Sequence, residues 1–375
     1  MPKYCSMISN GMASRGHHIE VWSPKPSFFK LSAPKKMKKW LGYVDQYVLF
    51  PKEVRARLKK CSPDTLFVFT DNALGPWVPL VHDRPHVIHC HDFLAQRSAL
   101  GEIKENPVQW SGQQYQAMIR RGYRKGMHFI CGSYKTKDDL DRFLNKKRVH
   151  AEVVYNGLNQ QYPHIDPSVA RRSLGAKFNI FLDDGFLLHV GGNQWYKNRV
   201  GVLELYEAWR RKSEMQLPLL MIGAPPTTEL LNKQTSSPFN KDIHFLTGVS
   251  DEFVRYAYAG ATVFLFPSLA EGFGWPVAEA MASGCPVVTT KEAPMTEVAG
   301  QAGFLIPRRP YDESKVSAWA KISADVIHEA VSLTPDERSK IVKAGIENSQ
   351  RFDTNKSLNQ IEEVYQYILK SELRA

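Results

Sequence analysis

Two glutamates, Glu271 and Glu279, flank a turn that contains Gly272 and Gly274. An apolar run precedes the turn, and Pro276 suits the first position of a following helix. Glycines let the backbone approach a ligand closely, and the free N–H groups at a helix start attract anions. Glu279, expected in the first helical turn, can accept two hydrogen bonds from neighbouring hydroxyls. The spacing therefore predicts a site for a phosphate beside a polyol, as in a nucleotide sugar.

A Gly-x-Gly turn by itself is more often a tight strand–helix junction. Here the longer string, Glu-Gly-Phe-Gly and then Pro-x-x-Glu-Ala-Met-Ala-x-Gly-x-Pro-Val-Val over residues 271–288, resembles the donor-site signature of family 4 glycosyltransferases. That resemblance implies an α/β protein of the GT-B type, with two Rossmann-like, doubly wound domains facing each other across a cleft. It implies that the first glutamate meets the donor sugar, the second meets the ribose, and the backbone of 273–275 contacts the sugar and diphosphate. The donor-binding residues expected here are Gly272, Phe273, Gly274, Trp275 and Glu279.

A second stretch, residues 190–198, resembles the family's strand and loop that carry a phosphate-binding lysine. Lys197 takes that position, where a cation would stabilise a departing diphosphate. Gly192 stands where the family often has arginine, so one expected cation is missing. Arg199 could replace it, or could equally be a solvated arginine at a helix start. The resemblance thus adds Gly191, Gly192, Asn193, Lys197 and Arg199 to the donor site.

The first half of the chain offers His89-Cys90-His91-Asp92 at the end of an apolar run. Two histidines beside an aspartate could bind a metal, but no further Cys or His cluster accompanies them, and a core histidine is the commoner case. His91 and Asp92 match the family's His-Asp pair near the reacting centre, so with Glu271 they are the expected catalytic residues. His89 should point to the opposite face of its strand.

A metal is not expected at any site. Asp139 and Asp141 resemble the metal-binding D-x-D of the other large glycosyltransferase architecture, but they fall within a predicted helix, 135–144, which they would solvate. The family resemblance implies that Lys197 and a helix start replace the divalent ion, and that no cofactor is needed beyond the nucleotide-sugar co-substrate. A UDP-hexose is favoured over GDP-mannose as that donor.

Alternating strands and helices must position these residues. Apolar runs predict strands at 18–22, 65–69, 86–90, 128–131 and 152–155 in the first half, and at 186–190, 217–222, 243–246, 262–266, 286–289 and 303–306 in the second. The helices predicted around them are 2–14, 197–212, 251–259, 276–283, 313–332, 335–349 and 354–371. This alternation predicts two α/β domains, over 1–165 and 170–350, joined by a linker within 156–184. The family resemblance implies that the first is the acceptor-side domain and the second is the donor domain. The terminal helix, about 354–375, should pack back on the first domain.

Composition excludes several classes of protein. The 375 residues are 43% hydrophobic and 23% charged, typical of a globular chain with two or three domains. No apolar stretch is long enough to span a membrane, and no secretory h-region opens the chain. The 5 cysteines are scattered, with no C-x-x-C pair, which favours reduced thiols. These features predict a cytoplasmic protein, with the inner face of a membrane as a further option.

Positive charge is concentrated in the first half. Residues 1–172 hold 28 lysines and arginines against 14 acidic residues, whereas the remainder holds 21 against 24. The densest segment combines lysines with aromatic side chains, which suits an anionic membrane surface; its key residues are Lys35, Lys36, Lys38, Lys39 and Trp40. A solvated basic face is the plain alternative. No nucleic-acid recognition motif accompanies the charge, so nucleic acid is not an expected partner.

The resemblance implies a retaining hexosyl transfer to an acceptor hydroxyl, with a lipid-linked or cell-envelope glycan as a fitting acceptor. The departing phosphate would take the acceptor's proton, and attack would occur on the same face of the sugar. Two alternatives stay open: a nucleotide-sugar epimerase of the same architecture, which should lack the full Glu-Gly-Phe-Gly signature, and an inactive basic binding protein. Family members begin with a strand and glycine loop that this chain lacks before its first helix, so we expect an unpaired sheet edge near 18–22 and 66–69, and a natural start upstream of Met1.

Overall fold

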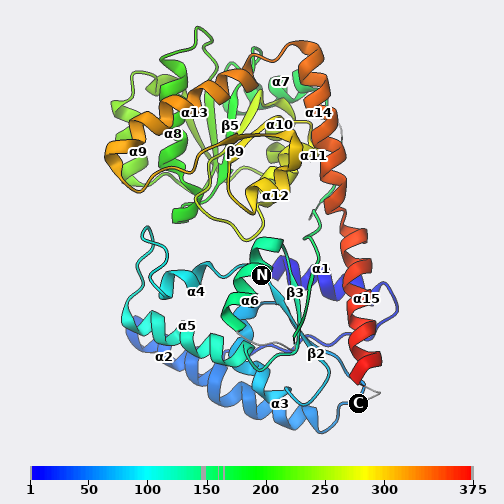
Figure 1. Ribbon diagram of the computed structural model, residues 1–375. Helices are drawn as coiled ribbons and strands as arrows, with labels where there is room; N and C mark the ends of the chain where they lie inside the picture. Colours follow the sequence, from blue (N-terminus) through cyan, green and yellow to red (C-terminus); the bar gives the residue numbers. More distant parts are fainter. Residues whose placement is uncertain (1, 145–148, 159, 164, 373–375) are drawn as a thin grey trace.

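The computed structural model describes residues 2–144, 149–158, 160–163 and 165–372, without the side chains of Pro2, Lys35, Lys36 and Glu372. Two parallel-sheet α/β units stack one above the other (Figure 1). The chain passes between them twice, once after β4 and once between α14 and α15. The fold class expected from the sequence is therefore confirmed.

The first unit is built on a four-stranded parallel sheet in the order β1-β2-β3-β4. Its strands are β1 (Phe67–Phe69), β2 (His86–Cys90), β3 (His128–Cys131) and β4 (His150–Val153). Its helices are α1 (Pro2–Ala13), α2 (Lys35–Val44), α3 (Phe50–Leu58), α4 (Leu94–Ala99), α5 (Trp110–Tyr123) and α6 (Tyr134–Leu144). A π-helical turn, η1 (Asp45–Leu49), joins α2 to α3, and the 3₁₀ segment η2 (Asn72–Leu80) follows β1.

The second unit has a six-stranded parallel sheet in the order β10-β9-β8-β5-β6-β7. The strands are β5 (Leu187–Gly191), β6 (Leu219–Gly223), β7 (Ile243–Thr247), β8 (Val263–Phe266), β9 (Val287–Thr290) and β10 (Gly303–Ile306). The helices are α7 (Pro167–Phe178), α8 (Arg199–Arg210), α9 (Thr228–Ser236), α10 (Asp251–Gly260), α11 (Trp275–Ala282), α12 (Met295–Ala299), α13 (Val316–Val331) and α14 (Pro335–Ser349). The short turn η3 (Trp195–Lys197) precedes α8.

Alternation along β8 divides the core of the second unit into two layers. Phe264 and Phe266 pack in the layer that contains Tyr258 of α10 and Val277 of α11. Leu265, between them in sequence, packs in the layer of α8 and α13 on the other face. Both faces of the central strand are buried, which explains why its sequence is a continuous apolar run.

The last helix, α15 (Thr354–Glu372), packs on the first sheet rather than on the second. Leu358, Ile361 and Ile368 share a buried cluster with Ile8 of α1 and Val87 of β2. The chain therefore returns to its first half after completing the second sheet, and α15 lies beside α1 (Figure 1). Residues 373–375, included in the predicted helix, lie outside the described part of the chain.

The strand predicted at residues 18–22 is wrong. The segment forms no β-ladder, and Ile19 and Val21 are 39% and 61% exposed. An alternating pattern makes a strand only where a neighbour supplies a hydrogen-bonded ladder. Among the described residues no strand pairs with the outer edge of β1; Trp22 packs near this strand, with its ring 5.8 Å from that of Phe67. The unpaired edge expected near 66–69 is therefore present.

The linker predicted over 156–184 is also too long, because α7 occupies its middle. Asp166 caps this helix by accepting hydrogen bonds from the N–H groups of Ser168 and Val169 at 2.8 and 3.3 Å. Leu174 is fully buried in the core formed with α10. Pro167 thus begins a helix at its first position instead of interrupting structure.

Candidate active site

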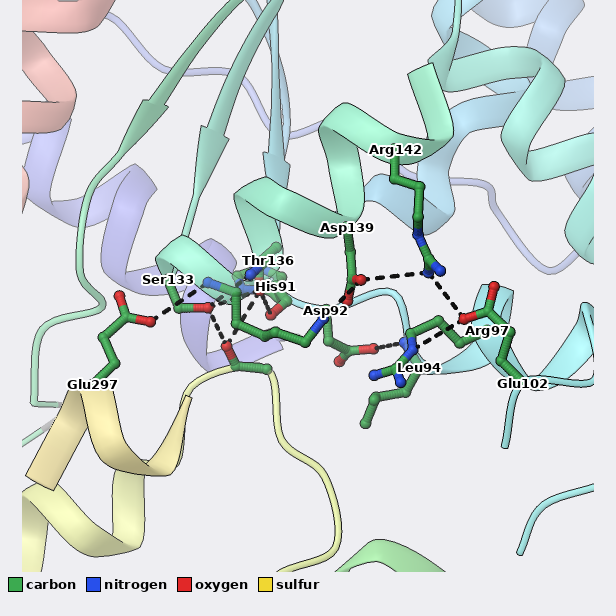
Figure 2. A network of polar contacts seen from close by, with 12 residues as sticks. His91, Asp92, Leu94, Arg97, Glu102, Ser133, Thr136, Asp139, Arg142 and Glu297 are labelled. Carbon is green, nitrogen blue, oxygen red and sulfur yellow. Dashed lines mark hydrogen bonds and ion pairs between the residues drawn. The ribbon is translucent and has the colours of Figure 1, made fainter. Parts of the chain in front are cut away.

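The carboxyl ends of β2 and β8 meet between the two units. The hydroxyl of Ser133, at the start of α6, donates a hydrogen bond of 2.7 Å to the carbonyl oxygen of Gly272. The hydroxyl of Thr136 lies 3.1 Å from the carbonyl oxygen of His91 and 3.2 Å from that of Gly272. Glu297 of α12 accepts the N–H of Tyr134 at 2.8 Å (Figure 2). These contacts tie the expected donor turn to the expected catalytic strand end.

Lys197 and Glu271 form an ion pair of 2.8 Å between Nζ and Oε1. Both side chains are largely buried, at 14% and 8% exposure. The hydroxyl of Ser268 also donates to Oε1 of Glu271, at 2.6 Å. Burial raises the pKa of Glu271, and the charge of Lys197 and these hydrogen bonds oppose that rise. The two residues expected to hold phosphate and sugar thus lie at one point.

Glu279 lies on α11, in its second turn rather than in the first turn expected from the sequence, because the helix begins at Trp275. The buried hydroxyl of Tyr258 donates to its Oε2 at 3.0 Å. Burial raises the pKa of Glu279, and hydrogen bonds from Tyr258 and Tyr162 partly offset the rise. Tyr258 therefore fixes one oxygen of a carboxylate close to the helix start.

The turn before α11 can contact a ligand through its backbone N–H groups rather than through its side chains. Gly274 precedes the helix with a φ of 103°, a conformation that glycine adopts without strain. Phe273 is buried against Phe352, with the ring centroids 5.2 Å apart. The indole N–H of Trp275 donates to the carbonyl of Gly157 in the connection between the units. The N–H groups at the helix start can meet an anion, whereas these aromatic rings hold the turn in place.

The loop after β5 is held by contacts with its neighbours. Gly191 packs closely against Gly223 of β6. A Cβ atom on Gly223 would lie 2.0 Å from the carbonyl oxygen of Gly191, so only glycine fits there. The amide of Asn193 donates to the carbonyl of Pro225 at 2.8 Å. Arg199 is only 5% exposed, so the solvated helix-start interpretation is wrong. Its Nη1 donates to the carbonyl of Ala224 at 2.9 Å and also contacts Asn193. Gly192 lies in this loop beside the side chain of Gln194.

His91 directly follows β2, and the prediction that His89 points to the opposite face is wrong. Residues two apart in a strand share a face, and the rings of His89 and His91 both pack against Tyr4, with centroids 5.6 and 4.4 Å away. His89 lies between the hydroxyls of Tyr4 and Tyr365, at 2.8 and 2.7 Å from its ring nitrogens. Burial lowers the pKa of His89 to about 3, so the ring is neutral. His91 instead approaches the carbonyl of Thr70 with Nε2 at 2.9 Å. A carbonyl only accepts, so Nε2 carries the proton and Nδ1 stays an acceptor.

A cavity of about 150 Å³ lies beside His91 and Asp92 in the first unit. Its polar walls come from residues that the sequence did not single out: Asp71, Asn72, Gln96 and Gln116. Burial raises the pKa of Asp92, and the neighbouring carboxylate of Asp71 raises it further. Asp71 and Asn72 follow the carboxyl end of β1. Open α/β sheets bind ligands at this edge, so the position of these residues just after an apolar run could have identified them from the sequence.

No group of three or more metal-ligating side chains gathers anywhere in the described ranges. Asp139 and Asp141 do lie on α6, but Asp139 is buried and paired with Lys135 at 2.7 Å, and Asp141 is paired with Lys137 at 2.6 Å. Both aspartates therefore form ion pairs along α6. The expectation that they lie on a solvent-exposed face does not hold for Asp139, which is buried. Within the same described ranges, no helix has the length and apolarity needed to cross a membrane.

The fold is the two-domain GT-B architecture of glycosyltransferases. Sucrose-phosphate synthase from Thermosynechococcus elongatus is similar over 98% of this chain and 93% of that one, with a TM-score of 0.71 and 18% identity. Anabaena HepE, solved in complex with UDP and glucose, is similar over 94% of this chain and 87% of that one, with a TM-score of 0.66 and 19% identity.

Sequence comparison defines the family. Residues 1–162 match Glycosyltransferase Family 4, and residues 185–325 match Glycosyl transferases group 1. The chain belongs to the family 4 glycosyltransferases, as its signature indicated. O-antigen chain mannosyltransferase B of Escherichia coli is 30% identical over 190 residues, which are 49% of this chain and 46% of the relative. The chain thus spans about half the length of this curated relative.

Proposed function

We propose that this protein transfers a hexose from a nucleotide sugar to a hydroxyl of a glycan acceptor, with retention of anomeric configuration. One observation carries the proposal: the Lys197–Glu271 pair and the start of α11 lie against the strand end that bears His91 and Asp92. Family membership supports it. The curated relative is named as a glycosyltransferase, which does not favour an epimerase or an inactive binding protein.

Donor binding would use the second unit. The diphosphate meets the N–H groups at the start of α11, where the helix dipole is positive. Lys197 adds a full positive charge, and it is already positioned by Glu271 at 2.8 Å. The carboxylate of Glu279, with Oε2 held by Tyr258, accepts the ribose hydroxyls. Glu271 then orients hydroxyls of the donor sugar.

Transfer would occur where the two units meet. Charge develops on the diphosphate as the glycosidic bond breaks, and Lys197 stabilises that charge. The acceptor hydroxyl enters from the cavity beside Asp92 and gives its proton to the departing phosphate oxygen, on the face that the leaving group vacates. His91 presents Nδ1 as an acceptor and can hold a sugar hydroxyl in position. Contact between the units excludes water, which limits donor hydrolysis.

Two donors are candidates for this site. The sequence favours a UDP-hexose, and Anabaena HepE was solved with UDP and glucose. The name of the curated relative instead favours mannose as the transferred sugar and an O-antigen chain as the acceptor. We propose a cell-envelope glycan as the acceptor, and a donor screen decides between the two nucleotides.

The acceptor would be met at a membrane surface. On α2 and the preceding loop, five large apolar side chains are exposed: Phe28, Phe29, Leu31, Met37 and Trp40, the last at 69%. Lys38 and Lys39 lie among them, over the rings of Phe29 and Tyr43 at 5.7 and 5.8 Å. Aromatic side chains mixed with lysine suit the headgroup layer of an anionic bilayer, at the inner face of a membrane.

This surface is rigidly linked to the acceptor cavity. Asp45 accepts the N–H groups of Phe28 and Phe29 at 2.9 Å each, which fixes the loop on the helix. The hydroxyl of Tyr47 lies 3.0 Å from that of Tyr115 on α5. The next residue of α5, Gln116, lines the cavity beside His91. Docking through α2 would therefore set the cavity at a defined height above the bilayer.

A donor screen tests the function. UDP-hexoses and GDP-mannose are added separately, and the melting temperature is recorded. A donor at about 100 times its Kd should stabilise the fold by about 2.7 kcal/mol. Glu279→Ala should abolish the shift while leaving the ligand-free melting temperature nearly unchanged. Glu347→Ala, an exposed glutamate on α14, is the control and should respond like the natural protein. Equal shifts in both variants would remove the donor assignment.

A further inference from the structure

A second, larger pocket lies on the other side of the second sheet. Its volume is about 420 Å³, within the range of small-molecule sites. It lies beside the starts of α8 and α9, with the segment 309–313 and Glu105 of the first unit completing its walls. Glu279 and the start of α11 do not line it. Asn193 and Arg199, which the family resemblance placed at the donor site, line this pocket, whereas the donor contacts proposed above do not use it.

Arg199 is the buried group that points to a ligand here. Its Nη1 is engaged by Ala224, but its Nε and Nη2 are buried with no hydrogen-bond partner in the described part of the chain. Burial lowers the pKa of Arg199, yet a guanidinium stays charged in proteins. Unsatisfied buried donors are costly. Both atoms are closed off from solvent in the structure, so a ligand oxygen in the pocket would satisfy them once the wall around Arg199 opens.

The charges of the walls argue against a phosphate. Glu105, Glu229 and Glu313 all line the pocket. The other cation, Arg309, is already held by Glu204 at 2.7 Å and by Glu313 at 3.0 Å. Glu105 is in turn held by Arg308 at 2.6 Å, so Glu229 and Arg199 balance each other, and the described walls offer a dianion no net positive charge. A neutral polyol suits the same walls, because each hydroxyl both donates to carboxylates and accepts from Arg199.

Two aromatic residues complete an environment that suits a saccharide. Trp195 of η3 and Tyr311 both line the pocket, and Tyr311 is 59% exposed. Aromatic rings offer an apolar face with a polar edge, which matches the apolar face of a sugar ring. Lys104 lies over the ring of Tyr311 at 5.9 Å, and Glu105 pairs with Arg308 at 2.6 Å. The loop after α4 thus reaches this pocket from the first unit (Figure 1).

We propose that this pocket binds a neutral saccharide unit of the acceptor glycan, at a distance from the unit that receives the hexose. The inference rests on the proposed transferase function. Two features connect the pocket to that reaction. Trp195 is in the same turn as Lys197, and Leu269, which lines the pocket, lies two residues before Glu271. The Glu105–Arg308 pair joins both units at the rim, so a bound saccharide favours the arrangement in which the units touch.

Binding of neutral oligosaccharides tests the pocket without any turnover. Mannotriose, maltotriose and chitotriose are titrated into the full chain, followed by tryptophan fluorescence and calorimetry. At least one should bind saturably, and Tyr311→Ala and Glu229→Gln should each weaken it about tenfold, or 1.4 kcal/mol. Phe181→Ala, which removes another exposed aromatic side chain of the same unit, should bind like the natural protein. No binding of any trisaccharide, or equal binding by all variants, would overturn the proposal.

Turnover separates this inference from the transferase itself. Tyr311→Ala should raise the KM for a long glycan acceptor about tenfold and leave nucleotide release by donor hydrolysis unchanged. Oligosaccharide binding without transfer from any donor would sink the transferase proposal and keep the pocket. Transfer by Tyr311→Ala with an unchanged KM would keep the transferase proposal and overturn the proposal for the pocket. Inorganic phosphate, if it bound here in place of the trisaccharides, would also overturn the saccharide assignment.

Discussion

The carbonyl oxygen of His91 occupies the place where a side chain at residue 272 would begin. A Cβ atom on Gly272 would lie 2.1 Å from that oxygen and 2.7 Å from Cβ of Asp92. Contacts below 3 Å between such atoms cannot be tolerated, so glycine is required for the two units to meet as they do. A glycine that the signature assigns to the donor thus also determines how closely the catalytic strand end approaches.

Replacing this glycine should separate the units without unfolding them. Gly272→Ala should lower kcat about 100-fold, because a displacement of about 1 Å at a reacting centre costs that much. The melting temperature should change little, since each sheet keeps its own core. Gly345→Ala is the matched control: its added Cβ meets only ordinary contacts of 3.5 Å and longer. Normal transfer by Gly272→Ala would show that the closed arrangement is not the active one.

Glu271 and His91 should matter for turnover more than for donor affinity. Glu271→Ala and His91→Ala should each lower kcat by about 10²–10⁴-fold, because both are polar groups at the proposed reacting centre. Nucleotide affinity, measured by calorimetry, should change only a few-fold, since Glu279 and the start of α11 remain. His82→Ala, an exposed histidine of the first unit, should transfer normally. Near-normal transfer by either active-site variant would refute its role.

The membrane proposal predicts binding that depends on both salt and Trp40. The protein should sediment with anionic liposomes at low salt and dissociate at high salt, because each basic residue contributes about 1 kcal/mol near such a surface. Trp40→Ala and neutralisation of Lys35, Lys36, Lys38 and Lys39 should each reduce binding. Neutralising Lys315 and Lys343, which are 72% and 80% exposed in the second unit, should not. Binding insensitive to salt and to the first set of changes would leave the surface without a membrane role.

Buried histidines should make the protein sensitive to mild acid. His89 has its pKa lowered to about 3, so the folded state holds it neutral while the unfolded chain takes up a proton near pH 6.5. This stability is full above pH 6.5 and is lost as the pH falls towards 3, by about 1.4 kcal/mol per unit. Urea titrations at pH 7 and pH 5 should differ by about 2 kcal/mol from this residue. His89→Gln should reduce that difference; an unchanged pH slope would assign the acid sensitivity elsewhere.

The second unit was predictable because its signals are local. Continuous apolar runs marked all six strands to within two residues. The four inner strands are mostly buried, and the edge strands β7 and β10 keep apolar runs although they are mostly half-buried. The glycine-bearing turn, Lys197 and Glu279 fall at strand and helix ends that such runs define. Helix α9 was missed because its sequence, TELLNKQTS, buries only Leu230 and so carries little periodicity.

The first unit and the second pocket depend on contacts distant in sequence. Residues 18–22 alternate like a strand, but no strand in the described part of the chain pairs with them, and a sequence pattern does not reveal its partner. The cavity beside Asp92 draws Asp71, Gln96 and Gln116 from three separate segments. Burial of Arg199 results from loops after β5 and β6 closing over it. These relationships exist only once the sheets are assembled.

The stereochemistry of transfer tests the central claim most directly. The donor identified by the screen is incubated with the full chain and a glycan acceptor, and the new linkage is examined by NMR. The account predicts release of the nucleoside diphosphate and a product with the same anomeric configuration as the donor, lost in Glu271→Ala and in His91→Ala. An inverted product, or no transfer from any UDP-hexose or from GDP-mannose, would contradict it.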